Sequence, residues 1–221
     1  MTEKDLRRLV AISAAIGATL VATMVAISVQ NGTGFQDFES ILRHNTPEAF
    51  SAAIVDAAPV LRLIYPLDTM YIFSYVTMVF AMVQLLPDRR MAGILALIAV
   101  MMTAGLDFIE NNHILAMTAA AERGVTADME QITFETVVTQ SKFNFGLLLT
   151  LTLSFLILQE SRVATITRWL ARAVVLFAPV ALLSPVTTLL YLTMNIALGY
   201  LIAATYWPRR SWIPAVTPAE A

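Results

Sequence analysis

Residues 101–115 read MMTAGLDFIENNHIL, an apolar run that ends in a group of ionisable and amide side chains. The polar members of this group are Asp107, Glu110, Asn111, Asn112 and His113. Ionisable residues are rare inside membrane-spanning helices, and those that occur there usually face the interior of a helix bundle. The stretch therefore predicts a membrane helix whose polar face points at other helices, and it marks the candidate site.

The composition of the whole chain is typical of a membrane protein. Of its 221 residues, 58% are hydrophobic and 14% are charged, and the mean hydropathy is +0.72. A soluble domain usually carries about 25% charged residues. The formal net charge of −2 gives no support for a nucleic-acid partner, and the expected environment is the lipid bilayer. The sequence contains no cysteine, which excludes disulfides, thiolate metal sites and a cysteine nucleophile.

Six stretches are apolar enough to cross a hydrocarbon core of about 30 Å as helices of about 20 residues. They are residues 9–29, 66–86, 91–111, 141–159, 168–183 and 186–206. The fifth is short, and Pro179 should kink or end it. Ser184 and Pro185 then suit the N-cap and the first position of the sixth helix. We predict an all-α integral membrane protein, a bundle of about six transmembrane helices that forms one domain over residues 1–221.

The basic residues predict that both termini lie in the cytoplasm. With the N-terminus inside, ten of the 14 lysines and arginines fall in inner segments and four in outer ones, as the positive-inside rule requires. The apolar stretch 9–29 is longer than the core of a cleaved signal peptide, which has about 7–15 residues. We therefore expect an uncleaved first helix and a multi-pass protein of the plasma (inner) membrane.

Two long connections are expected on the outer side of the membrane. Residues 30–65 begin with the turn signal NGTG and then carry apolar residues at helical spacing. This pattern predicts two short amphipathic helices at the interface, the second starting at Thr46. Such helices would offer a surface to a membrane or periplasmic protein partner.

The second outer connection, residues 111–141, is expected to be a projecting helical hairpin. The third and fourth helices would each extend to about 30 residues, roughly 45 Å. Gly124 should end the third helix and Thr126 should open the fourth. The charged residues of the hairpin, Glu135 among them, indicate a solvated surface, and the hairpin is a second possible contact for a partner.

Depth in the membrane relates two of the charged residues. Asp107 lies sixteen residues after Met91, and Lys142 lies sixteen residues before Leu158, so both should stand about 24 Å from the inner end of their helices. A lone charge costs at least about 3 kcal/mol at the bilayer centre and less near its edge. We therefore predict that the two side chains face inward and pair, with Asp68 of the second helix at a similar height.

Helical spacing aligns other polar residues with this pair. Together these polar residues predict a cavity in the outer half of the bundle, deepest at Asn195. Gly199 should allow close helix packing beside this cavity. The candidate ligand or ion path comprises Asp68, Tyr71, Tyr75, Asp107, Glu110, Asn111, Lys142, Asn144, Tyr191 and Asn195.

The sequence does not indicate a cofactor. Glu110 and His113 have the spacing used in di-metal carboxylate bundles, but those use the motif twice with two further glutamates. A single metal ion held by Asp68, Asp107, Glu110 and His113 is the candidate metal site that these residues leave open. Hydrolase and nucleotide-binding motifs are absent from the sequence.

Three functions fit these residues. The first is binding or transport of a small or ionic ligand or of protons, which paired intramembrane charges suit. The second is a membrane-embedded enzyme acting on a lipid or isoprenoid, with Asp107 or Glu110 as general acid or base and His113 as its partner. The third is a non-catalytic subunit or assembly factor of a membrane complex. We favour the first, because solvation alone does not explain charges at matching depth on three helices.

Overall fold

The computed structural model describes residues 1–33, 38, 46–158, 161–181 and 185–207. Within these ranges the chain is helical and has no strand, which confirms the expected all-α class. The elements are α1 (Glu3–Asn31), α2 (Pro47–Leu85), the short 3₁₀ helix η1 (Pro87–Arg89), α3 (Arg90–Ala121), α4 (Met129–Leu156), α5 (Arg162–Ala181) and α6 (Pro185–Tyr206).

Five of the described helices are long and apolar enough to cross a membrane, namely α1, α2, α3 together with η1, α5 and α6. The fourth expected span, in α4, is not among them. The apolar half of α4 also contains the polar residues Gln140, Ser141, Lys142 and Asn144, which lower its mean hydropathy. A crossing by α4, and with it the count of six, stays a prediction.

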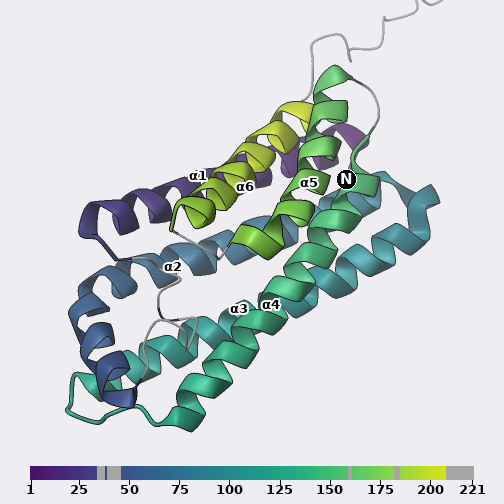
Figure 1. Ribbon diagram of the computed structural model, residues 1–221. Coiled ribbons are helices and arrows are strands. Elements are labelled where there is room, and N and C mark those ends of the chain that lie inside the picture. Colours follow the sequence, from purple (N-terminus) through teal and green to yellow (C-terminus); the bar gives the residue numbers. More distant parts are fainter. Residues whose placement is uncertain (34–37, 39–45, 159–160, 182–184, 208–221) are drawn as a thin grey trace, which may run out of the picture.

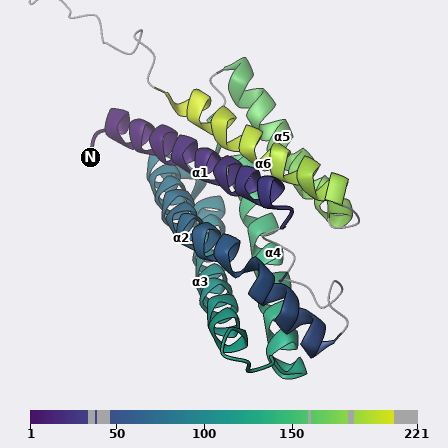
Figure 2. The same ribbon diagram turned by 90° about the vertical axis from the view of Figure 1, so that its left-hand side faces the viewer.

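The six α-helices pack as a closed ring, which Figures 1 and 2 show from two sides. Each helix contacts the next in chain order, and α6 packs back on α1. The contact between α1 and α6 is close, because a Cβ added at Gly199 would lie 2.9 Å from Cβ of Ala18. The close packing expected at Gly199 is therefore confirmed.

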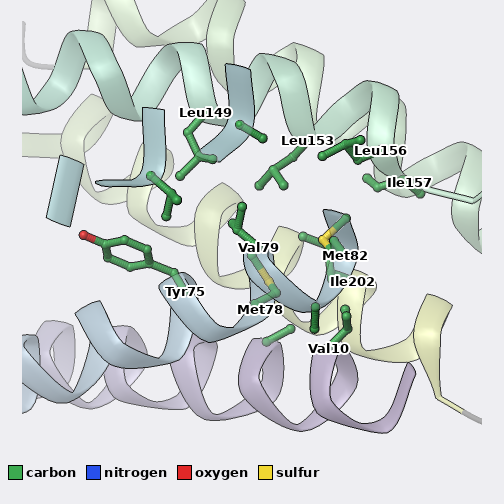
Figure 3. Close-up of a cluster of buried hydrophobic side chains, with 14 of the residues drawn as sticks. Val10, Tyr75, Met78, Val79, Met82, Leu149, Leu153, Leu156, Ile157 and Ile202 are labelled. Atoms are coloured by element: carbon green, nitrogen blue, oxygen red, sulfur yellow. The ribbon is translucent and has the colours of Figure 1, made fainter. Parts of the chain in front are cut away.

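The main apolar cluster lies inside this ring. It includes side chains from all six α-helices, and the close packing of these side chains holds the helices together. Figure 3 shows part of it, with Val10 of α1, Met78 and Val79 of α2, Leu149 and Leu153 of α4, and Ile202 of α6 gathered between the helices.

The course of α2 corrects the sequence analysis. The helix expected from Pro66 begins at Pro47, and the Thr46 side chain accepts a hydrogen bond from the amide of Ala49 at 3.2 Å. Pro59 and Pro66 both lie inside the helix. Prolines remove backbone hydrogen bonds and bend a helix, and α2 changes direction along its length in Figure 1. The second expected amphipathic helix is thus the first part of α2.

The first expected amphipathic helix falls mainly on residues 34–37 and 39–45, which lie outside the described part of the chain. The fifth helix also differs from expectation, since α5 starts at Arg162 and contains Pro179 without ending there. Pro185 is the first residue of α6, as expected, whereas Ser184 lies outside the described residues.

The α3–α4 hairpin has helices of 32 and 28 residues. Gly124 in the turn has a φ of +82°, the left-handed conformation that favours glycine. The N-cap of α4 is Asp128 and not Thr126. The Asp128 side chain accepts a hydrogen bond from the amide of Gln131, whose side chain accepts one from the amide of Asp128. This reciprocal pair satisfies two free amides, which a cap at Thr126 could not do because its N3 residue would be Met129, which has no comparable acceptor.

A second apolar core packs the start of α2 against the α3–α4 hairpin. Its fully buried side chains include Phe50, Ile54 and Leu61 of α2, Ile114 of α3 and Ile132 of α4. We call this part, residues 47–61 and 112–138, the hairpin lobe, and the remainder of the six helices the ring.

Candidate functional site

Lys142 of α4 bridges two carboxylates of α3. Its Nζ lies 3.2 Å from Oδ1 of Asp107 and 2.6 Å from Oε2 of Glu110. The two carboxylates are three residues apart on one face of the helix, and both are buried. The expected Asp107–Lys142 pair is therefore present, and Glu110 shares the same ammonium. Buried charges of this kind are tolerated because they are paired.

Hydrogen bonds from neighbouring helices hold the carboxylates in place. The Tyr75 hydroxyl of α2 donates to Oδ2 of Asp107 at 2.8 Å. From α3 to α2, the side-chain amide of Asn111 donates a hydrogen bond to Oδ2 of Asp68 at 2.7 Å. Asp68 makes no ion pair with a described residue, which distinguishes it from Asp107.

These residues border a cavity of about 230 Å³ inside the ring. Side chains of α1, α2, α3, α4 and α6 line it, and no residue of α5 does. Eight of the ten residues of the expected path are among them: Asp68, Tyr71, Tyr75, Asp107, Asn111, Lys142, Tyr191 and Asn195. Sequence analysis missed the polar lining residues Ser13, Ser74 and Thr150, because small hydroxyl residues are common in membrane helices whether or not they face a cavity.

Two residues of the expected path do not line the cavity. Asn144 is exposed. It follows Lys142 by two positions, which is a rotation of about 200° around the helix. Its side chain therefore points away from the interior of the ring. Glu110 is buried in its contact with Lys142 and is not a lining residue. Asn112, two residues after Glu110 on α3, is exposed, as expected for the solvated end of a helix.

A second buried polar pair lies in the hairpin lobe. Nδ1 of His113 is 2.6 Å from Oε2 of Glu135, and Glu135 is only 1% exposed. The expectation that Glu135 belongs to a solvated surface is therefore wrong. The missed signal is helical spacing, since Glu135 shares its face of α4 with the buried residues Ile132, Val138 and Thr139.

Glu135 precedes Ser141, the start of the expected span of its helix. Burial raises the pKa of Glu135 to about 9, and the nearby negative charge of Glu110 adds to the effect. The carboxyl group therefore keeps its proton at neutral pH. In that state its O–H donates to Nδ1 of a neutral His113 imidazole, which makes the pair a hydrogen bond rather than an ion pair.

The four candidate metal ligands are not brought together. Among the described residues no group of three or more histidine, aspartate and glutamate side chains is close enough to hold a metal ion. The ammonium of Lys142 takes the position between Asp107 and Glu110 that a metal cation would need, and His113 is turned toward Glu135. The geometry gives the weak metal hypothesis no support.

No protein-family model, no curated protein and no solved structure matches this chain. The fold and the cavity are therefore the basis for its functional assignment. They define an all-helical chain with apolar helices that suit a membrane, arranged around a polar cavity.

Proposed function

We propose that this chain is a multi-pass membrane protein that binds a small cationic ligand in the cavity of its ring. The observation that carries the proposal is the difference between two aspartates. Asp107 forms an ion pair with Lys142, whereas Asp68 lines the cavity without an ion pair to a described residue. A carboxylate in low-dielectric surroundings requires a proton or a positive partner, and a cation in the cavity would supply one.

The rest of the cavity wall suits an apolar body attached to that cation. Away from Asp68 the lining includes Met78, Leu149, Leu198 and Ile202. Tyr71 and Tyr75 lie near the charged end with their rings 5.1 Å apart, edge to face, and tyrosine faces attract cations. Since drug-sized pockets usually have volumes of about 300–1,000 Å³, a cavity of about 230 Å³ suits a smaller molecule, such as an amine with one ring.

This arrangement favours binding over the enzyme hypothesis. Catalysis would require Asp107 or Glu110 to reach the substrate together with the partner His113, but of these three only Asp107 lines the cavity. Transport of the bound cation is the natural use of such a site within a membrane, because the lining residues belong to several separate helices that can move relative to one another.

Thermal unfolding of the purified protein in detergent tests the proposal. Benzylamine, phenethylamine and cyclohexylamine would each be compared with the neutral alcohol of the same shape, and benzylamine also with benzoate. A ligand that binds the folded state at a hundredfold excess over its Kd adds about 2.7 kcal/mol of stability. We expect the amines to raise the unfolding temperature and the alcohols and benzoate to leave it unchanged.

Two variants complete the test. Asp68→Asn should abolish the effect of the amines, whereas Asp88→Asn, at an exposed aspartate outside the cavity, should retain it. Equal effects of amines and alcohols, or an amine effect that survives in Asp68→Asn, would contradict the proposal. In that case the hypothesis of a non-catalytic subunit would become the stronger one, and co-purification of a membrane partner would support it.

A further inference from the structure

The proposed ligand site does not use the buried pair in the hairpin lobe. We propose that His113 and Glu135 pass protons between the surface of the hairpin lobe and the carboxylates of the cavity. The connection runs through Glu110 and Lys142. The protein would thereby set the protonation state of its cavity from the solution at the hairpin end.

The geometry of the α3–α4 interface supports this path. On α3, Asp107, Glu110 and His113 follow one another at three-residue steps, and on α4 the facing residues recur at helical spacing. Contacts of 2.6 Å join His113 to Glu135 and Glu110 to Lys142, and the Lys142–Asp107 distance is 3.2 Å. A strip of ionisable groups thus crosses the interface from the lobe to the cavity.

Two buried oxygens of α4 lie where the strip continues from the His113–Glu135 pair to the Glu110–Lys142 pair. Oε1 of Glu135 and Oγ1 of Thr139 make no hydrogen bond with a described residue, although both side chains are almost fully buried. They lie on α4 between the His113 contact and Lys142. Buried polar atoms without a partner are uncommon in folded proteins and call for an explanation. We assign them to proton transfer from Glu135 to Glu110.

The transfer steps conserve protons and charge. Glu135 first passes its proton to Glu110. The imidazole of His113, whose side chain is 20% exposed, then takes a proton from solution and becomes an imidazolium ion, and its Nδ1–H returns a proton to the ionised Glu135, which restores the starting pair. Lys142 then gives one N–H proton to Asp107 and takes the proton of Glu110, which leaves the ammonium intact. One proton has entered at the surface and one has reached a carboxylate that lines the cavity.

Charged groups on the other elements do not interrupt the strip. From α2 it is faced by Asp68 and by Tyr75, which donates to Asp107. The parts of α1 and α6 that line the cavity carry no charged residue. Arg62, next to the lobe, and Glu122 form a separate, more exposed ion pair. The strip therefore has more carboxylates than cations, which leaves carboxylates able to accept a proton.

Infrared spectroscopy of hydrogen–deuterium exchange at buried carboxylic acids tests this proposal without a ligand. The protein in lipid vesicles would be mixed rapidly with D₂O, and the shift of the protonated-carboxyl band followed in time. Asp68→Asn and Asp107→Asn assign the part of the band that belongs to the cavity. In Glu135→Gln we expect this part to exchange roughly 100-fold more slowly, the effect of losing a placed proton-transfer group.

Two further variants guard against an effect of misfolding. His113→Gln changes a partly exposed side chain at the start of the path and should slow exchange in the same direction. Glu130→Gln, at an exposed position of the same helix, should exchange at the wild-type rate. Exchange at the wild-type rate in both Glu135→Gln and His113→Gln would overturn the proposal. So would the absence of any protonated-carboxyl band from the cavity.

Discussion

The ring and the hairpin lobe are built on the same two helices, α3 and α4, yet only the ring encloses the cavity described above. In the lobe these helices pack against the first part of α2 and against Phe38, and large side chains such as Phe50, Ile54 and Leu61 are buried between them. In the ring four further helical segments surround them, and polar groups on five helices line the space left between them. The comparison shows what the number of surrounding helices decides. A polar helix face surrounded by many helices borders a cavity, whereas one packed against few helices contacts a partner side chain directly.

The polar groups of the two regions differ accordingly. In the ring, Lys142 serves two carboxylates and a third carboxylate, Asp68, faces the cavity. In the lobe, Glu135 has one partner, His113, and is protonated at neutral pH because burial raises its pKa to about 9. Ion pairing with Lys142 therefore offsets part of the negative charge in the ring, whereas proton uptake neutralises Glu135 in the lobe.

The largest expected effect comes from removing the shared cation. Lys142→Met leaves Asp107 and Glu110 buried without their partner, and breaking a buried ion pair in this way costs about 3–5 kcal/mol. Thermal unfolding in detergent should show a large loss of stability. The double variant Lys142→Met/Asp107→Asn should recover only part of it, since Glu110 keeps its charge. Full recovery in this double variant would mean that Glu110 does not share the ammonium.

The next effect tests the packing of the ring. Gly199→Val places side-chain atoms against Ala18 of α1, where even a Cβ would lie at 2.9 Å, and overpacking of this kind costs about 1–3 kcal/mol. Gly105→Ala is the matched control, because its added Cβ would meet nothing within 4 Å. If both variants unfold at the same temperature, α1 and α6 do not approach as closely as described.

A pH effect belongs to the lobe. Glu135 has an ordinary pKa of 4.5 and a folded-state pKa of about 9, so the folded protein holds an extra proton between these values. Its contribution to stability is complete below pH 4.5 and is lost progressively as the pH rises to about 9, by at most about 1.4 kcal/mol per pH unit.

Glu135→Gln should remove this slope, which unfolding measured from pH 5 to pH 9 would show. Glutamine keeps the size of the side chain and cannot ionise. A variant whose stability declines with pH as steeply as that of the wild type would place the titrating group elsewhere.

The smallest expected effect is at the start of α4. Asp128→Ala removes the N-cap and should cost about 1 kcal/mol, while Thr126→Ala should cost little because its side chain caps nothing in the structure. Calorimetry of the two variants distinguishes the observed helix start from the one that the sequence predicts. A larger loss in Thr126→Ala would restore the sequence-based start.

The sequence predicts the Asp107–Lys142 pair because the rise of a helix is constant. Equal numbers of residues from the inner ends of two antiparallel helices therefore give equal heights. It does not predict that Glu110 shares the ammonium, since height alone does not say how far a flexible lysine reaches along the facing helix. Asn144 was assigned to the path by height, although its rotation around the helix points it outward.

Other differences between the predicted and the observed structure arise because the same local sequence signal occurs at more than one position. Proline marks the start of a helix, but α2 contains three of them and only Pro47 stands at the start. Glu135 lies in a stretch that is polar on average, and its burial depends on tertiary contact with His113. Such contacts between separate helices decide which of several equivalent local signals is used.

Charge-selective access to the cavity is the most direct test of the central claim. Because the chain has no cysteine, Thr103→Cys would place a single thiol in the cavity lining. Its rates of modification by a cationic and an anionic methanethiosulfonate reagent of similar size would be compared in lipid vesicles, in the Thr103→Cys protein and in its Asp68→Asn form. The account predicts faster reaction with the cationic reagent and a clear loss of that preference in Asp68→Asn. Equal rates for the two reagents, or a preference that does not depend on Asp68, would contradict it.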